Sequence, residues 1–184
     1  LGVARQFVLL GFIDDDKAKA GRSINGVDIM APEEVLDAVE RMGVTDIVAL
    51  RGDPPKGAEK FVAHPDGFAN SVELVEALAK TGKFNIAVGA YPEPHPEAAN
   101  PWADIDWLKR KIDAGANRAI TQFFFEAETF LRFRDACAKA GISAPIIPGI
   151  LPIVSWEGAK RFAARCNAKV PAKLDEAFTH AIRD

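Results

Sequence analysis

The feature that most constrains the fold is a repeated alternation of short apolar runs with longer segments in which apolar residues recur every three or four positions. Short apolar runs are typical of strands buried in a parallel sheet, and spacings of three and four are typical of helices. The pattern predicts six strands, at 7–13, 27–30, 46–50, 85–90, 119–125 and 146–150. A strand, a helix and another strand joined by short connections require parallel pairing, so we expect an α/β fold built from parallel βα units.

The helices are predicted at 32–42, 71–80, 105–113, 126–140, 156–166 and 172–182. The first four are followed by Gly43, Gly82, Gly115 and Gly141, which are typical helix stops. Residues 14–26 are too polar to form a packed crossover helix, so we expect the first two strands to be organised differently from the later ones. Six strands fit either an open doubly wound (Rossmann- or flavodoxin-like) sheet or a partial (β/α)8 barrel, because a closed barrel needs eight.

Composition excludes several classes of function. A net charge of −3 and a pI near 5.7 give no electrostatic footprint for nucleic acid or an anionic membrane. No apolar run approaches the roughly 20 residues that a membrane span needs, and the first residues do not read as a signal peptide. Cys137 and Cys166 lie in helical patterns without metal-ligand spacing. We therefore expect two reduced thiols and a cytoplasmic location.

Polar side chains follow the predicted strands at their carboxyl ends, where parallel α/β sheets bind ligands. Arg51-Gly52-Asp53 follow one strand, Tyr91 and His95 follow the next, and Gln122 lies near the end of a third. Taken together they predict a pocket for a phosphate-bearing or acidic small molecule. Taken singly, Arg51 and Asp53 could equally pair across a turn, and His95 could be an ordinary loop residue.

The sequence contains no motif for a metal site, a phosphate-binding loop or a nucleophilic hydrolase. The three histidines, His64, His95 and His180, do not form a metal-ligand cluster, so we predict no metal site. A glycine-rich phosphate loop and a nucleophile elbow are also missing from the sequence. A hydrolase mechanism therefore has no support.

Five segments resemble bacterial 5,10-methylenetetrahydrofolate reductase closely and in the same order. They include Leu-Arg-Gly-Asp-Pro-Pro, Ala-Tyr-Pro-Glu-Pro-His-Pro-Glu-Ala and Ala-Ile-Thr-Gln-Phe-Phe-Phe, and they lie at 47–55, 90–98, 108–125, 130–135 and 146–153. The resemblance implies a (β/α)8 barrel with FAD at the carboxyl ends of its strands. It implies hydride transfer from a nicotinamide cofactor through the flavin to methylenetetrahydrofolate.

The resemblance also implies roles for individual residues. Asp53 would lie near the flavin ring and tune its electronics, and no other residue is given a catalytic part. Gln122 would hold the pterin edge of the folate, and Phe162 would stack on substrate or nicotinamide. The implied cofactor contacts are Arg51, Gly52, Asp53, Tyr91, His95, Asp104, Arg110 and Lys111, of which the last two are cations suited to a diphosphate.

The sequence departs from that family at identifiable points. The Phe-Glu-Phe-Phe-Pro-Pro motif, whose Glu is the family's general acid, is missing from these 184 residues, as are the family's early His-Leu-Thr-Cys flavin contacts. Trp107 stands where a small polar cofactor contact is expected, and the sequence ends before the family's last strand. We therefore predict that reductase turnover is absent or very weak.

Residues 10–16 and 21–30 are similar to the Rossmann-like N-terminal domain of nucleotide-sugar dehydratases. The combination predicts a recombined or engineered hybrid in a single domain, with a Rossmann-like fragment at 1–46, a half-barrel reductase fragment at 47–171 and a terminal helix at 172–184. The join would lie within the strand at 46–50. Two alternatives stay open: a flavoprotein whose pocket is completed by a partner chain or in a homodimer, and a ligand-free scaffold.

Overall fold

The chain divides into two compact units, one formed by Leu1–Thr45 and Asp53–Ala69 and the other by Asp46–Gly52 and Asn70–Asp184. The computed structural model describes residues 12–13, 22–24, 27–30, 39, 41–51, 61–63, 67–95, 98 and 100–181. The boundary between Thr45 and Asp46 lies at the start of the strand in which the sequence predicts a join.

The first unit contains a small sheet of three short strands, β1 (Phe12–Ile13), β2 (Ser23–Ile24) and β3 (Val27–Met30). The order is β1-β3-β2, with β3 parallel to β1 and antiparallel to β2. The sequence prediction missed β2, although Asn25-Gly26 between Ile24 and Val27 is a dipeptide typical of hairpin turns. Residues 7–11 of the first predicted strand, and all of the first predicted helix except Val39, Arg41 and Met42, lie outside the described residues.

The second unit contains the main sheet, whose four strands are all parallel. They are β4 (Asp46–Ala49), β5 (Asn85–Ala90), β6 (Arg118–Phe123) and β7 (Ile146–Gly149), in the order β4-β5-β6-β7. The predicted parallel α/β fold is confirmed here. The first two predicted strands, which the sequence sets apart from the later ones, pair with each other as β1 and β3 in the first unit, so the main sheet has four of the six predicted strands.

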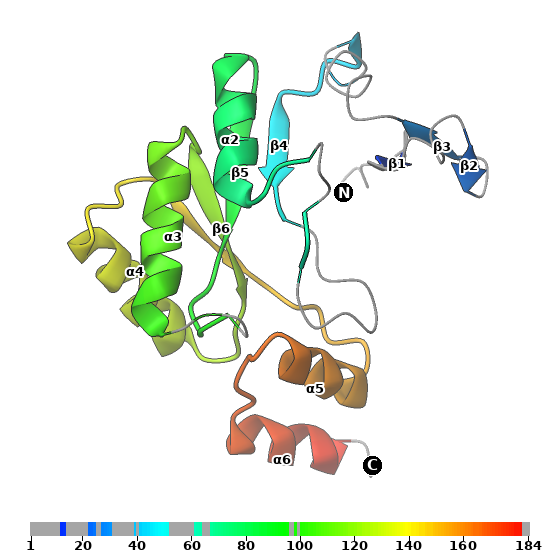
Figure 1. The fold of residues 1–184 in the computed structure, drawn as a ribbon. Helices are drawn as coiled ribbons and strands as arrows, with labels where there is room; N and C mark the ends of the chain where they lie inside the picture. The colour runs from blue at the N-terminus through cyan, green and yellow to red at the C-terminus, as the bar shows by residue number, and fades with distance from the viewer. Residues whose placement is uncertain are drawn as a thin grey trace, which may run out of the picture. The chain divides into compact units, whose positions relative to one another are not determined.

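Helices α2 (Ser71–Lys80), α3 (Pro101–Asp113) and α4 (Ala127–Lys139) connect successive strands and pack on one face of this sheet (Figure 1). Their buried side chains join the outward residues of the strands in a single core, formed by Val75, Leu78, Leu108, Phe133, Cys137, Ile86, Val88 and Ala119 among others. Strand order follows chain order without a reversal. The described sheet is therefore wound in one direction, as in a barrel, and lacks the switch point of a doubly wound sheet.

The opposite face of the main sheet carries apolar side chains that remain accessible. Val48, Leu50 and Ile147 are 53%, 58% and 40% exposed. Neighbours along a strand point to opposite faces, so Ala49 is buried under the helices while Val48 is not. In a closed barrel this face would be the interior.

Helix bounds follow local capping signals more closely than apolar periodicity. The predicted bounds of α2 are confirmed, and Gly43, Gly82, Gly115 and Gly141 all have positive φ angles at helix ends. The prediction for α3 was wrong by one turn. Asn100 caps the helix, its side chain accepting from the amides of Trp102 and Ala103, and Pro101 occupies the first turn.

Replacing Asn70 with alanine is expected to lower the free energy of unfolding by about 1 kcal/mol. The Asn70 side chain accepts from the amides of Val72 and Glu73 at 2.9 and 3.2 Å, so the variant leaves two amides of α2 without their cap. Urea unfolding followed by circular dichroism measures the loss. Asn70→Asp, which keeps the acceptor, serves as the control, and equal losses in both variants would contradict the capping role.

Helices α5 (Trp156–Arg165) and α6 (Ala172–Ala181) follow β7 and pack against each other. The rings of Trp156 and Phe178 stack at 4.5 Å, and the indole Nε1 of Trp156 donates to Asp175 at 2.7 Å. Ala163 of α5 is fully buried in a second apolar cluster with Phe123, at the carboxyl end of β6. The two C-terminal helices are thereby attached to the end of the sheet where the candidate site lies.

Candidate functional site

The carboxyl end of β5 gathers most of the polar residues that the sequence predicts for a cofactor. Tyr91 and His95 follow the strand directly, and their rings meet edge to face with centroids 4.7 Å apart. The backbone amide of His95 donates to Asp104 Oδ2 at 2.9 Å. Asp104 lies in the first turn of α3, so the capped start of this helix places the carboxylate where it holds the loop.

Lys111 lies two turns further along α3, on the same face of the helix as Asp104. Its side chain is buried, and Nζ donates to the carbonyl oxygen of Gly89 at 2.5 Å. Burial lowers the pKa of Lys111 to about 8, and the nearby Asp104 carboxylate opposes this shift. The ammonium therefore loses its proton much more readily than an exposed lysine does.

Gly89, Tyr91, His95, Asp104 and Lys111 form a connected group, which we call the β5 rim cluster. A Cβ atom built on Gly89 would lie 3.4 Å from the Leu50 side chain and 3.7 Å from the Tyr91 hydroxyl oxygen. Gly89 therefore lies beside the Tyr91 hydroxyl group and the Lys111 ammonium. A group that carries a flat ring and an anionic arm fits such a donor set.

Arg110 lies away from the β5 rim cluster. Its guanidinium pairs with Asp106 at 2.9 Å on the solvent side of α3 and lies 5.2 Å from the centroid of the Trp107 ring. One residue further along the helix is about 100° around its axis, which is why Lys111 is buried and Arg110 is not. Trp107, the expected departure from the family pattern, is 43% exposed.

The remaining predicted site residues lie on other elements. Arg51 is half-buried directly after β4, whereas Gly52 and Asp53 lie outside the described residues. Gln122 is half-buried on β6, and its Oε1 accepts from the Phe123 amide at 3.0 Å. Phe162 of α5 stacks on the Phe123 ring, with centroids 5.2 Å apart, and is 37% exposed. The structure thus brings together Tyr91, His95, Asp104 and Lys111, and leaves the roles of Gln122 and Phe162 as predictions.

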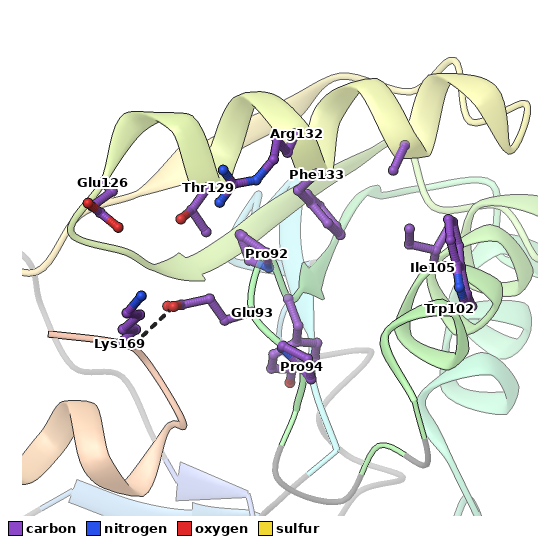
Figure 2. A pocket seen from close by; sticks show the side chains of 12 residues that line it. Pro92, Glu93, Pro94, Trp102, Ile105, Glu126, Thr129, Arg132, Phe133 and Lys169 are labelled. Carbon is purple, nitrogen blue, oxygen red and sulfur yellow. Dashed lines mark hydrogen bonds between the residues drawn. The ribbon is translucent and has the colours of Figure 1, made fainter. Parts of the chain in front are cut away.

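A cavity of about 280 Å³ lies beside the β5 rim cluster, between the loop after β5, α3 and α4. Thr129, Arg132 and Phe133 line it from α4, and Trp102 and Ile105 line it from α3 (Figure 2). Sequence reasoning did not single out these residues, because each belongs to an ordinary amphipathic helix. Only Tyr91 belongs to both the cavity and the cluster.

Glu93 and Lys169 close one side of the cavity (Figure 2). The backbone amide of Lys169 donates to Glu93 Oε1 at 3.0 Å. Burial raises the pKa of Glu93, and the Glu126 carboxylate adds to this, while the Lys169 amide and the charge of Lys169 lower it. No signal in the sequence pairs these two residues, which are 76 positions apart.

Two absences hold for the described part of the chain. Within it, no helix is both long and apolar enough to cross a membrane. Among the same residues, no three side chains of His, Cys, Asp or Glu gather as a metal site would require. Cys137 is buried and Cys166 half-buried, and neither is in a disulfide.

Comparisons with known proteins all match most of the chain to one enzyme family. The family model for methylenetetrahydrofolate reductase matches residues 27–184. The 5,10-methylenetetrahydrofolate reductase of Escherichia coli (strain K12) is 52% identical over 136 residues, which is 74% of this chain and 44% of that protein. A probable methylenetetrahydrofolate reductase (NADH) of Oryza sativa is 42% identical over 157 residues, or 79% of this chain and 26% of that protein.

The match to the family model also bears on the predicted join. It begins at residue 27 and therefore includes residues 27–46, which the sequence interpretation assigned to a nucleotide-sugar dehydratase lineage. The comparisons give that assignment no support. The chain spans less than half the length of the bacterial relative that it matches.

Proposed function

The chain belongs to the methylenetetrahydrofolate reductase family, and from this we propose that its second unit forms part of the FAD site of such an oxidoreductase. The observation that carries the proposal is the β5 rim cluster. Four of the residues that the family resemblance predicts as cofactor contacts are linked there by a ring contact, a hydrogen bond and an electrostatic interaction: Tyr91, His95, Asp104 and Lys111. Two rings, a carboxylate and a cation at the carboxyl end of a parallel strand suit a flavin nucleotide.

Each residue of the cluster has a separate part in this proposal. Asp104 holds the loop through the His95 amide and so sets the position of both rings. Lys111, and Arg51 at the end of the neighbouring strand, supply positive charge for the diphosphate arm. When bound, the flavin would supply the hydride-transfer chemistry of the family. The folate contacts of Gln122 and Phe162 and the tuning of the flavin by Asp53 belong to the same proposal.

We propose further that this chain by itself turns over the folate weakly or not at all. The family's general-acid motif is missing from the 184 residues, so protonation of the folate has no assigned donor. A second chain could complete the pocket, and the accessible apolar face of the main sheet, with Val48, Leu50 and Ile147, favours this alternative over a ligand-free scaffold. Homodimerisation and a cytoplasmic location stay predictions. A hybrid origin also stays a prediction, and the family match, which begins at residue 27, leaves residues 1–26 as the segment of other origin.

Titration of the purified protein with FAD, followed by quenching of flavin fluorescence, tests the proposal. We expect saturable binding, and we expect Lys111→Met to weaken it about tenfold, because a charge-assisted contact to a phosphate is lost. Lys109→Met is the matched control. It removes the same charge from the same helix, but Lys109 lies at the surface, where it pairs with Asp113. Equal effects of the two variants, or no binding of FAD by the unaltered protein, would contradict the proposal.

The affinity should also depend on pH in a way that identifies Lys111. Because its pKa is lowered to about 8, the ammonium loses its proton as the pH rises through 8 and the attraction for a diphosphate weakens. FAD should therefore bind more weakly at pH 9 than at pH 7 in the unaltered protein, and this difference should shrink in Lys111→Met. The FAD affinity of Arg110→Gln is measured in parallel. The sequence predicts that Arg110 contacts the cofactor, whereas in the structure it pairs with Asp106, so an unchanged affinity would favour the structure.

A further inference from the structure

The loop after β5 is tied at one side to a segment that is distant in sequence. The side-chain amide of Asn167 donates through Nδ2 to the carbonyl oxygen of Pro94 at 2.9 Å. The backbone amide of Lys169 donates to Glu93 Oε1 at 3.0 Å, the bond drawn in Figure 2. The two bonds join positions 73 and 76 residues apart, and both lie between residues 93–94 and the connection from α5 to α6.

The loop after β5 is rich in proline. Pro92 and Pro94 have no backbone N–H, so the short stretch between Tyr91 and His95 offers few donors for bonds of its own. On its other side, the His95 amide donates to Asp104 Oδ2, and the His95 carbonyl oxygen accepts from the Ala98 amide at 2.8 Å. The bonds from Asn167 and Lys169 therefore help to decide where the Tyr91 and His95 rings lie.

The segment that holds the loop is itself firmly anchored. Ala168 is buried beside Phe123 and Ala163, and its amide donates to the carbonyl oxygen of Ala163 at 2.9 Å. Asn167 has a φ of 55°, a left-handed conformation that asparagine tolerates better than most residues. This conformation at the end of α5 turns the segment so that Asn167 and the Lys169 amide reach the loop while Ala168 enters the core.

We propose that Glu93 and Asn167 form a latch that positions Tyr91 and His95 for the cofactor. Both are positioning residues: Glu93 acts by accepting the Lys169 amide, and Asn167 acts by donating to Pro94. The inference rests on the proposed flavin site for its effect on binding. The latch itself is a property of the chain without any cofactor, and it can be observed separately.

The first test measures FAD affinity in variants that remove one bond at a time. Glu93→Ala removes the acceptor, and Asn167→Gly removes the donor but keeps a residue that adopts a positive φ without strain. We expect each to weaken binding about three- to tenfold, the range for one hydrogen bond. Glu93→Gln keeps an oxygen acceptor and should bind within about twofold of the unaltered protein. Failure of Glu93→Gln to restore affinity would overturn the role assigned to the Glu93 oxygen.

The double variant tests whether the two hydrogen bonds are energetically coupled. If each holds the same loop, Glu93→Ala with Asn167→Gly should weaken binding by clearly less than the product of the single effects. If the two substitutions acted independently, their fold-losses of FAD affinity would multiply, and that outcome would overturn the latch. Thermal unfolding midpoints of all variants are measured alongside. If FAD affinity falls only in those variants whose unfolding midpoint also falls, the loss reflects general destabilisation, and that result would also overturn the latch.

The second test needs no flavin. Amide hydrogen exchange at Lys169 and His95, read by NMR in the cofactor-free protein, should accelerate at both sites in Glu93→Ala and remain near normal in Glu93→Gln. If the unaltered protein fails to bind FAD but shows this pattern, the proposed function is wrong and the latch stands. If Glu93→Ala leaves the exchange at both amides unchanged, the latch is wrong whatever binds at the β5 rim cluster.

Discussion

Gly149→Ala is expected to lower the free energy of unfolding by about 3 kcal/mol, among the largest effects of a single methyl group in this chain. A Cβ atom at Gly149 would overlap the backbone carbonyl of Thr121 on the neighbouring strand. The β6–β7 register shifts between Ile120 and Phe123, and the Gly149 amide donates to Thr121 Oγ1 at 2.9 Å. The close approach is therefore made by backbone on both sides, which cannot move as a flexible side chain can.

Gly158→Ala provides the matched control. It is the same substitution, but a Cβ at Gly158 would meet only Ser155 at 3.5 Å, an ordinary contact within α5. Alanine is the better helix former, so this variant should be neutral or more stable by up to about 1 kcal/mol. Urea unfolding of both variants measures the difference. Equal stabilities would show that β6 and β7 separate at little cost and that the glycine is not required at the strand end.

The buried lysine gives the second large effect, and it appears as a dependence on pH. The pKa of Lys111 is lowered in the folded protein from its ordinary value of 10.5 to about 8, so between these values the unfolded chain binds a proton that the folded chain does not. Stability must then rise with pH across this window and fall as the pH drops through 8. The gap corresponds to about 3 kcal/mol between the two ends of the window.

Comparison of the unaltered protein with Lys111→Met isolates this contribution, because the other ionisable groups titrate in both. The stability difference between them should move by up to about 3 kcal/mol in favour of lysine from pH 7.5 to pH 10.5. Lys109→Met, which removes a surface lysine from the same helix, should show no such movement. A difference that stays constant with pH would mean that Lys111 is solvated in the folded state, which would contradict its burial against Gly89.

Helix ends illustrate how far local signals reach. Asn70 and Gly82 delimit α2, whose bounds the sequence predicts correctly, because a cap and a left-handed stop act within one turn. The start of α3 was missed because its first turn shows no apolar periodicity: Trp102 is 71% exposed and Asp104 faces the loop. The signal was Asn100-Pro101, a cap followed by a favoured first residue, and it outweighs the periodicity.

The candidate site shows the same division between local and distant information. Tyr91, His95, Asp104 and Lys111 were identified from motifs, and the structure places them in one cluster. The same motifs grouped Arg110 with Lys111 as equivalent cations. Only the packing of α3 on β5 distinguishes them, since it buries one and leaves the other paired with Asp106 at the surface.

The sequence by itself determined the α/β class, the order of strands and helices in the second unit, most helix ends and the family. These depend on apolar periodicity, caps and motifs, whose physical causes act over a few neighbouring residues. Tertiary structure alone decided that β1 and β3 pair with each other, that the main sheet winds in one direction, and that Asn167 and Lys169 bond to the loop at Pro94 and Glu93. Contacts between residues more than seventy positions apart arise only when whole elements pack, and no local pattern carries that information.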